Sequence, residues 1–157
     1  MINFFKFYLR LFIKVTLLLI FIPEAFSQKK IPKQKKVIVN SVEEKKEKLI
    51  EISDNIWEAA ELSLQEFKSS KYLSDYAEEN GFIVEKGVAG IPTAFTATYG
   101  SGRPIIGIMG EFDANAGISQ KKQPKKEPLV KGAAGHGCGH NLFGTASLAA
   151  AIAIKEQ

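Results

Sequence analysis

Cysteine, histidine and tryptophan are scarce in this sequence of 157 residues, which contains one, two and one of them. A single cysteine cannot form a disulfide within the chain, so a disulfide-stapled fold is excluded. No cysteine lies near the N-terminus, which excludes a lipid-modified bacterial N-terminus. Charge of one sign is not in large excess either: the net charge is +4, and no basic helix is interleaved with aromatic residues, so we expect no nucleic-acid partner.

The first 27 residues have the layout of a secretory signal peptide. Scattered basic residues precede an apolar run from Val15 to Ile22, and Ala25 and Ser27 are small residues in front of a cut before Gln28. The apolar run is shorter than the about 20 residues that span a bilayer. We therefore expect an exported protein, periplasmic or secreted, with no membrane partner after cleavage. An uncleaved anchor is the alternative.

The mature chain is predicted to start with a flexible basic lead-in over residues 28–41, which contains a proline. From Val42 onward, apolar residues at spacings of three and four predict a helix. Ser41 and Glu44 have the spacing of a capping box at its start. The apolar stripe of this helix comprises Leu49, Ile52, Ile56, Ala60, Leu64 and Phe67.

A second helix and several strands are predicted next. The helix covers residues 72–77 and ends at Asn80–Gly81, a suitable left-handed cap. The helical spacing of apolar residues then ends, and residues 82–85 and 93–99 have the composition of strands. A continuous apolar run at 104–109 predicts a strand that is buried on both faces. Because a short glycine-rich turn joins the last two runs, we expect a hairpin that leads into a buried sheet.

Two carboxylates, Glu111 and Asp113, follow the predicted buried strand. Because they are two residues apart, both side chains can project to the same side. Ligands of open α/β sheets gather beyond the carboxyl ends of the strands. One of these acids can therefore orient a metal ligand, or it can cap a neighbouring turn, and the residues leave both interpretations open. Residues 114–131 are rich in lysine and predict a solvated loop.

Both histidines and the only cysteine stand in one glycine-rich stretch, as His136, Cys138 and His140. In an extended backbone these alternate side chains face the same way. Thiolate and imidazole are ligands that zinc prefers, so the stretch predicts a three-ligand metal site. A glycine-rich turn with a buried cysteine is the alternative. The apolar residues 142–155 predict a helix packed between layers, with Asn141 as its N-cap.

The order of these motifs resembles the start of the M20 family of metallopeptidases and amidohydrolases, in the branch of the aminobenzoyl-glutamate utilization protein B type. The resemblance implies an α/β fold, in which residues 42–157 form the N-terminal part of the catalytic domain, with a mixed sheet flanked by helices. The motifs that carry the resemblance lie at residues 56–58, 72–73, 79–82, 87–95, 110–114, 117–120 and 135–141.

The resemblance also implies an activity, namely metal-dependent hydrolysis of the amide bond of N-acyl amino acids, with p-aminobenzoyl-glutamate as the substrate of this branch. The implied cofactors are two zinc or manganese ions per site. Cys138 and His140 match metal ligands, which reduces the three-ligand interpretation to two. Asp113 matches the acid that supports the metal site, whereas His136 and Glu111 match no role that can be transferred.

Other parts of the family's catalytic machinery have no match before Gln157. These are the general-base glutamate, a glutamate ligand, further histidine ligands and the domain through which full-length members dimerise. We therefore expect the chain to be the N-terminal portion of an enzyme and to be inactive by itself. The alternative is a non-catalytic remnant, or a weak metal-binding or subunit-interaction module.

Overall fold

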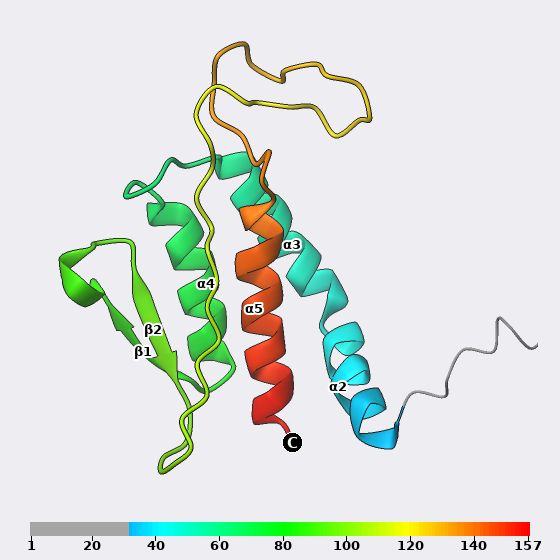
Figure 1. The fold of residues 1–157 in the computed structure, drawn as a ribbon, viewed down its shortest axis with the longest axis vertical. Helices are drawn as coiled ribbons and strands as arrows, with labels where there is room; N and C mark the ends of the chain where they lie inside the picture. Colours follow the sequence, from blue (N-terminus) through cyan, green and yellow to red (C-terminus); the bar gives the residue numbers. More distant parts are fainter. Residues whose placement is uncertain (1–31) are drawn as a thin grey trace, which may run out of the picture. The chain divides into compact units, whose positions relative to one another are not determined.

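A computed structural model of the chain describes residues 32–157, so the predicted signal peptide lies outside the described residues. The described residues form four α-helices, one 3-10 helix and a two-stranded sheet (Figure 1). This is a mixed α/β arrangement, as predicted, although the sheet is smaller than expected. None of the described helices is long and apolar enough to cross a membrane. The elements are α2 (Lys33–Glu44), α3 (Lys46–Ala59), α4 (Phe67–Glu79), β1 (Ile83–Lys86), η2 (Val88–Gly90), β2 (Phe95–Thr98) and α5 (His140–Lys155).

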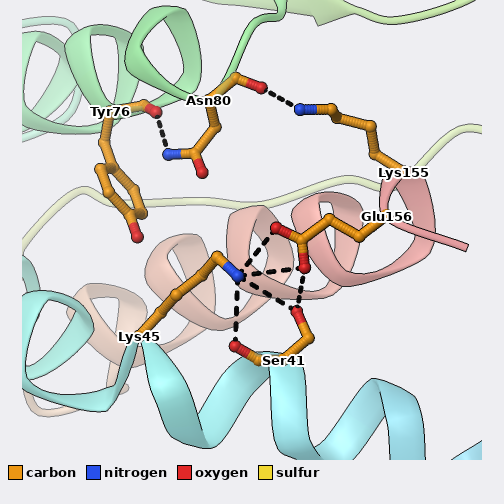
Figure 2. A network of polar contacts seen from close by, with 6 residues as sticks. All are labelled: Ser41, Lys45, Tyr76, Asn80, Lys155 and Glu156. Carbon is orange, nitrogen blue, oxygen red and sulfur yellow. Dashed lines mark hydrogen bonds and ion pairs between the residues drawn. The ribbon is translucent and has the colours of Figure 1, made fainter.

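Helix α2 occupies most of the stretch that was predicted as a flexible lead-in. It begins at Lys33, and periodicity gave no signal there because most of its side chains are exposed. Ser41 lies inside α2, so the predicted capping box is wrong. Its buried hydroxyl instead donates a hydrogen bond to Glu156, with an O–O distance of 2.5 Å, and Lys45 forms an ion pair with the same carboxylate at 2.8 Å (Figure 2).

Helix α3 supplies the centre of the core. Leu49, Ile52 and Ile56 confirm the first half of the predicted stripe, and Ile56 is fully buried. Burying such a side chain contributes about 1.5–3 kcal/mol. Helix α3 packs against α4 and α5, and α4 also packs against the hairpin (Figure 1). The rest of the core cluster comprises Leu73, Tyr76, Ala149 and Ile152.

The predicted stripe does not continue beyond Ile56, because α3 ends at Ala59. Ala60 adopts a left-handed conformation with φ 43° and ψ 44°, and its N–H donates to the carbonyl of Ile56 at 3.1 Å. The chain then turns before α4 begins at Phe67. Leu64 and Phe67 are consequently exposed rather than part of the core.

The hairpin forms between β1 and β2, which pair antiparallel with Ile83 opposite Thr98. Both strands were predicted, but β2 was expected to pair with residues 104–109. Those residues form no strand, and Ile105 and Ile106 are 80% and 74% exposed, so the prediction of a buried strand is wrong. Among the described residues, 104–109 have no backbone–backbone hydrogen bond. A hydrogen bond links them to α5, because the Ser147 hydroxyl donates to the Met109 carbonyl at 2.7 Å.

Candidate metal centre

Two glycines allow the acidic segment, residues 110–113, to lie against the start of α5. A Cβ atom added to Gly144 would lie 2.8 Å from the carbonyl oxygen of Glu111, and one added to Gly110 would lie 3.1 Å from the Gly144 Cα. Real Cβ atoms essentially never come as close as 2.8 Å, and a contact of 3.1 Å requires the neighbouring atoms to shift, which a packed interior resists. The absence of both side chains therefore lets residues 110–113 lie against the first turns of α5.

Two carboxylates face opposite ring nitrogens of His140, the first residue of α5. Asp113 Oδ1 lies 2.8 Å from Nδ1, and Glu111 Oε2 lies 3.1 Å from Nε2. One ligand atom from each residue lies within 4.8 Å of the others. Glu111 is exposed, whereas Asp113 and His140 are partly buried. Both carboxylates thus face the same partner, whereas their two-residue spacing predicted only a shared direction.

The chemistry of this group fits a divalent cation. When His140 is neutral and Nδ1–H donates to Asp113, the lone pair of Nε2 faces an oxygen of Glu111. Two facing acceptors need a proton or a cation between them. Imidazole nitrogen and carboxylate oxygen are ligands of zinc and related metals. A carboxylate on the second nitrogen is the partner that orients a metal-bound histidine, so Glu111 and His140 could hold the ion while Asp113 orients the ring.

Two side-chain anchors fix the glycine-rich stretch to α3. His136 Nε2 lies 3.0 Å from the carbonyl oxygen of Ile56. Asn141 Nδ2 donates to the carbonyl oxygen and to the hydroxyl of Ser53, at 3.3 and 3.0 Å. Burial lowers the pKa of His136 below its ordinary value, which favours the neutral ring. The two anchors flank the predicted metal ligands of this stretch.

Backbone hydrogen bonds fix the acidic segment at the same end of α3. The Ala114 N–H donates to the Glu61 carbonyl at 2.7 Å, and Asn115 exchanges two bonds with Gly135 at 2.9 and 3.0 Å. The carboxylate of Glu61 accepts backbone N–H groups from the first turn of α4 at 3.0 and 2.8 Å. The end of α3 therefore supports both sequence segments that carry the site.

The structure does not bring all the predicted ligands together. Cys138 has an exposed side chain and lies outside the group around His140. His136 contacts α3 instead. The predicted extended backbone does not form, because Gly139 adopts a left-handed conformation with φ 82° and serves as the N-cap of α5. Asn141, which was predicted to be that cap, lies inside the helix.

Glu111 joins the group although the family resemblance transferred no role to it. The only signal in the sequence was its spacing from Asp113, which predicted a shared direction but not a shared partner. The close approach of Gly110 to Gly144 determines that partner. Such an approach depends on how two distant segments pack.

Comparison with known proteins relates the chain to the M20 type of peptidases and amidohydrolases, as its motifs predicted. No family model matches the chain. It is 43% identical over 122 residues to the B subunit of p-aminobenzoyl-glutamate hydrolase of Escherichia coli (strain K12), a match that covers 76% of this chain and 25% of that protein.

Two archaeal carboxypeptidases extend this relationship. The chain is 31% identical over 104 residues to thermostable carboxypeptidase 2 of Saccharolobus solfataricus, covering 65% of this chain and 26% of that protein. Thermostable carboxypeptidase 1 of the same organism matches to the same extent. The chain thus spans about a quarter of the length of the curated relatives it matches.

Proposed function

We propose that the chain supplies part of the metal centre of an amidohydrolase that cleaves N-acyl amino acids. The observation that carries this proposal is the position of His140 between Glu111 and Asp113. The 43% identity to one polypeptide of a known hydrolase supports the reaction class. The name of that relative suggests p-aminobenzoyl-glutamate, or a closely similar compound, as the substrate.

Each residue of the group has a distinct role in this proposal. Glu111 and Nε2 of His140 bind the metal, and Cys138 is the further predicted ligand, with its sulfur accessible at the surface. Asp113 accepts the Nδ1–H of His140 and keeps the lone pair of Nε2 directed at the ion. The metal, zinc or manganese and two ions per site, would activate a water molecule and polarise the amide carbonyl.

The described residues supply this chemistry only in part. A catalytic metal needs about three protein ligands and an open position, together with a base beside the bound water. We propose that additional polypeptide supplies the base, the other ligands and the dimerisation domain. The match covers about a quarter of each relative, which supports this view. By itself, the chain is then expected to bind metal without hydrolysing the amide.

Metal binding tests the first part of the proposal. Isothermal titration of the purified chain with Zn²⁺ or Mn²⁺ should show stoichiometric binding, which His140→Ala abolishes. Glu127→Gln is the matched control, because Glu127 pairs with Lys121 in the lysine-rich loop. If the unaltered chain binds neither metal, the proposed metal centre is wrong.

A chimera tests the substrate. The chain would replace the matching 25% of the Escherichia coli hydrolase polypeptide. We expect this chimera to release p-aminobenzoate from p-aminobenzoyl-glutamate and the His140→Ala version to be inactive. Metal binding without any hydrolysis of p-aminobenzoyl-glutamate or acetylated amino acids by the chimera would contradict the proposed reaction.

We also propose that residues 1–27 direct export and are removed. Mass spectrometry of the expressed protein should then show a mature chain that starts at Gln28 in the periplasm or the medium. An intact Met1 on protein retained in the cell would contradict this proposal.

A second candidate function is a non-catalytic subunit-interaction module. It is favoured by the exposed apolar residues at 104–109 and by Leu142 on α5, which is 64% exposed, because such surface is typical of contacts with another polypeptide. The metal titration separates the two candidates, since an interaction module has no need of an ion at His140.

A further inference from the structure

We propose that His136 is a positioning residue for the metal centre. Its Nε2–H donates to the Ile56 carbonyl and thereby holds the glycine-rich stretch in the conformation that presents Cys138 and His140. This inference rests on the proposed function, and its test below has one readout that needs no metal.

The hydrogen bond determines which nitrogen of the His136 ring carries the proton. A carbonyl oxygen can only accept, so the proton lies on Nε2 and Nδ1 is left as an acceptor. Nδ1 is buried and has no hydrogen-bond partner among the described residues. A buried acceptor without a partner is unfavourable. The polar contribution of the ring is therefore the bond from Nε2 to α3.

The accepting carbonyl is part of a rigid structure. Ile56 is fully buried in the core, and its carbonyl also accepts the N–H of Ala60 at the end of α3. By contrast, the stretch that His136 anchors contains Gly137 and Gly139, whose backbones have many accessible conformations. The bond from His136 to this fixed acceptor therefore adds a side-chain restraint to the two backbone bonds that Gly135 exchanges with Asn115.

The anchors at the two ends of the stretch act on different ligands. Asn141 fixes the first turn of α5, which carries His140, to Ser53. His136 fixes the opposite end, beyond Cys138. Loss of the His136 bond should therefore release Cys138 while α5 and His140 stay in place, which changes the ligand set around the ion more than it changes the fold.

Two amide variants separate the nitrogens of the ring. In His136→Gln the side-chain NH₂ group reaches the position of Nε2 and can still donate to Ile56, whereas in His136→Asn it reaches only the position of Nδ1. Co²⁺ is titrated into each purified chain, and both the affinity and the visible absorption spectrum of the bound ion are recorded. Hydrogen exchange at the amides of residues 136–139 is measured without metal.

We expect the Gln variant to match the unaltered chain in affinity, spectrum and exchange. The Asn variant should bind Co²⁺ about 10-fold to 100-fold more weakly, with an altered spectrum and faster exchange at 136–139. If the Asn variant does not fold, His136→Met replaces it, because methionine keeps the length and the apolar bulk but cannot donate.

Three outcomes would overturn the inference. An Asn or Met variant that matches the unaltered chain shows that the bond does not position the stretch. A Gln variant as weak as the Asn variant shows that a donor at the position of Nε2 does not position the stretch. If the unaltered chain binds no Co²⁺, the proposed function fails separately, and the exchange data decide alone: equal exchange in all variants overturns the inference, and faster exchange in the Asn variant but not in the Gln variant supports it.

Discussion

At the scale of single residues, the site depends on His140, whose two ring nitrogens face two different carboxylates. Asp113 occupies Nδ1 of His140 at 2.8 Å, and the partly buried carboxylate is held there by the neighbouring backbone bond from Ala114 to Glu61. Glu111 faces Nε2 from a more exposed position. The acid on Nδ1 therefore directs the ring, and the acid on Nε2 is free to share an ion with it.

Removing the charge of Asp113 should weaken metal binding without removing a ligand. In Asp113→Asn the amide no longer stabilises positive charge on the His140 ring, so the ring is a poorer donor to the ion. We expect the Zn²⁺ affinity to fall about 10-fold to 100-fold, as measured by calorimetric titration. Asp75→Asn is the control, because Asp75 pairs with Lys71 on α4. Equal affinities of the Asp113→Asn and unaltered chains would show that Asp113 does not orient the ring.

At the scale of elements, the site is built where a segment without regular structure lies against a helix. Gly144 makes this possible in α5, although glycine weakens a helix interior by about 0.5–1 kcal/mol relative to alanine. The space that a Cβ would need is already occupied by the Glu111 carbonyl and by Leu73. Helix α5 is thus less stable than it would be with alanine at position 144, but only glycine leaves room for the close contact with the acidic segment.

The substitution Gly144→Ala should displace the acidic segment. The new Cβ would lie 2.8 Å from the Glu111 carbonyl oxygen, and overpacking of this kind costs about 1–3 kcal/mol. We expect a lower melting temperature and weaker Zn²⁺ binding, despite the better helix propensity of alanine. Gly107→Ala is the matched control, because a Cβ there meets nothing within 4 Å. If the Gly144→Ala chain were more stable and bound Zn²⁺ with unchanged affinity, the proposed close contact between the acidic segment and α5 would be wrong.

The contact between α2 and the end of α5 should weaken in acid. Hydrogen bonds from Lys45 and then Ser41 hold the pKa of Glu156 below its ordinary value of 4.5. A lowered pKa means that the stabilisation is present above the ordinary value and is lost as the pH falls through the lowered value. The unaltered chain should therefore lose more melting temperature between about pH 5 and about pH 3 than Glu156→Gln does. Equal losses in thermal melts at both pH values would show that the contact adds no stability.

Helices were predictable from sequence where the spacing of apolar residues marks the face that is buried. The spacing of Leu49, Ile52 and Ile56 predicted the core face of α3, and Asn80–Gly81 correctly marked the end of α4, where Gly81 has φ 79°. Helix α2 was missed because a mostly exposed helix leaves little periodicity. Residues 104–109 were wrongly predicted to be a buried strand. An apolar run is typical of such strands, but a strand also needs a neighbouring strand or helix to cover it.

The site was predictable to a smaller extent. The spacing of Glu111 and Asp113 correctly predicted that they face the same side, and His140 is the predicted ligand that lies in the group. The exposed position of Cys138 depends on the left-handed backbone of Gly139, which glycine permits but does not require. The spacing of residues along the chain predicts neither the conformation of Gly139 nor the contact of His136 with α3.

At the scale of the whole described molecule, apolar surface lies open on one unpaired segment and one helix. Ile105, Ile106 and Met109 are 73–80% exposed, and Leu142 and Ile154 of α5 are 64% and 48% exposed. Extended backbone without partners and exposed apolar side chains favour association with another chain. The described fold therefore has a core that is too small to cover its own apolar residues.

The purified chain should consequently associate and melt without a sharp transition. We expect sedimentation to show a concentration-dependent increase in mass, and thermal unfolding to be broad. Replacing Ile105 and Ile106 by threonine should raise the monomer fraction, because it removes exposed apolar area from the unpaired segment. The matched control is Ile52→Thr, which should lower stability without reducing association, since Ile52 is buried. A sharp cooperative melt of a monomer would contradict this prediction.

The contact of Ser41 and Lys45 with Glu156 has a consequence for protein synthesis. Its partners are separated by 115 and 111 residues, which a ribosome adding about 5–20 residues per second translates in roughly 6–23 s. Helices α3 and α4 are completed in the first part of that interval, whereas Ile152 of α5, which closes the core cluster, is made only near its end. The nascent chain therefore exposes its core to the cell for many seconds, a period in which chaperones that bind apolar segments would have access to Ile56 and its neighbours.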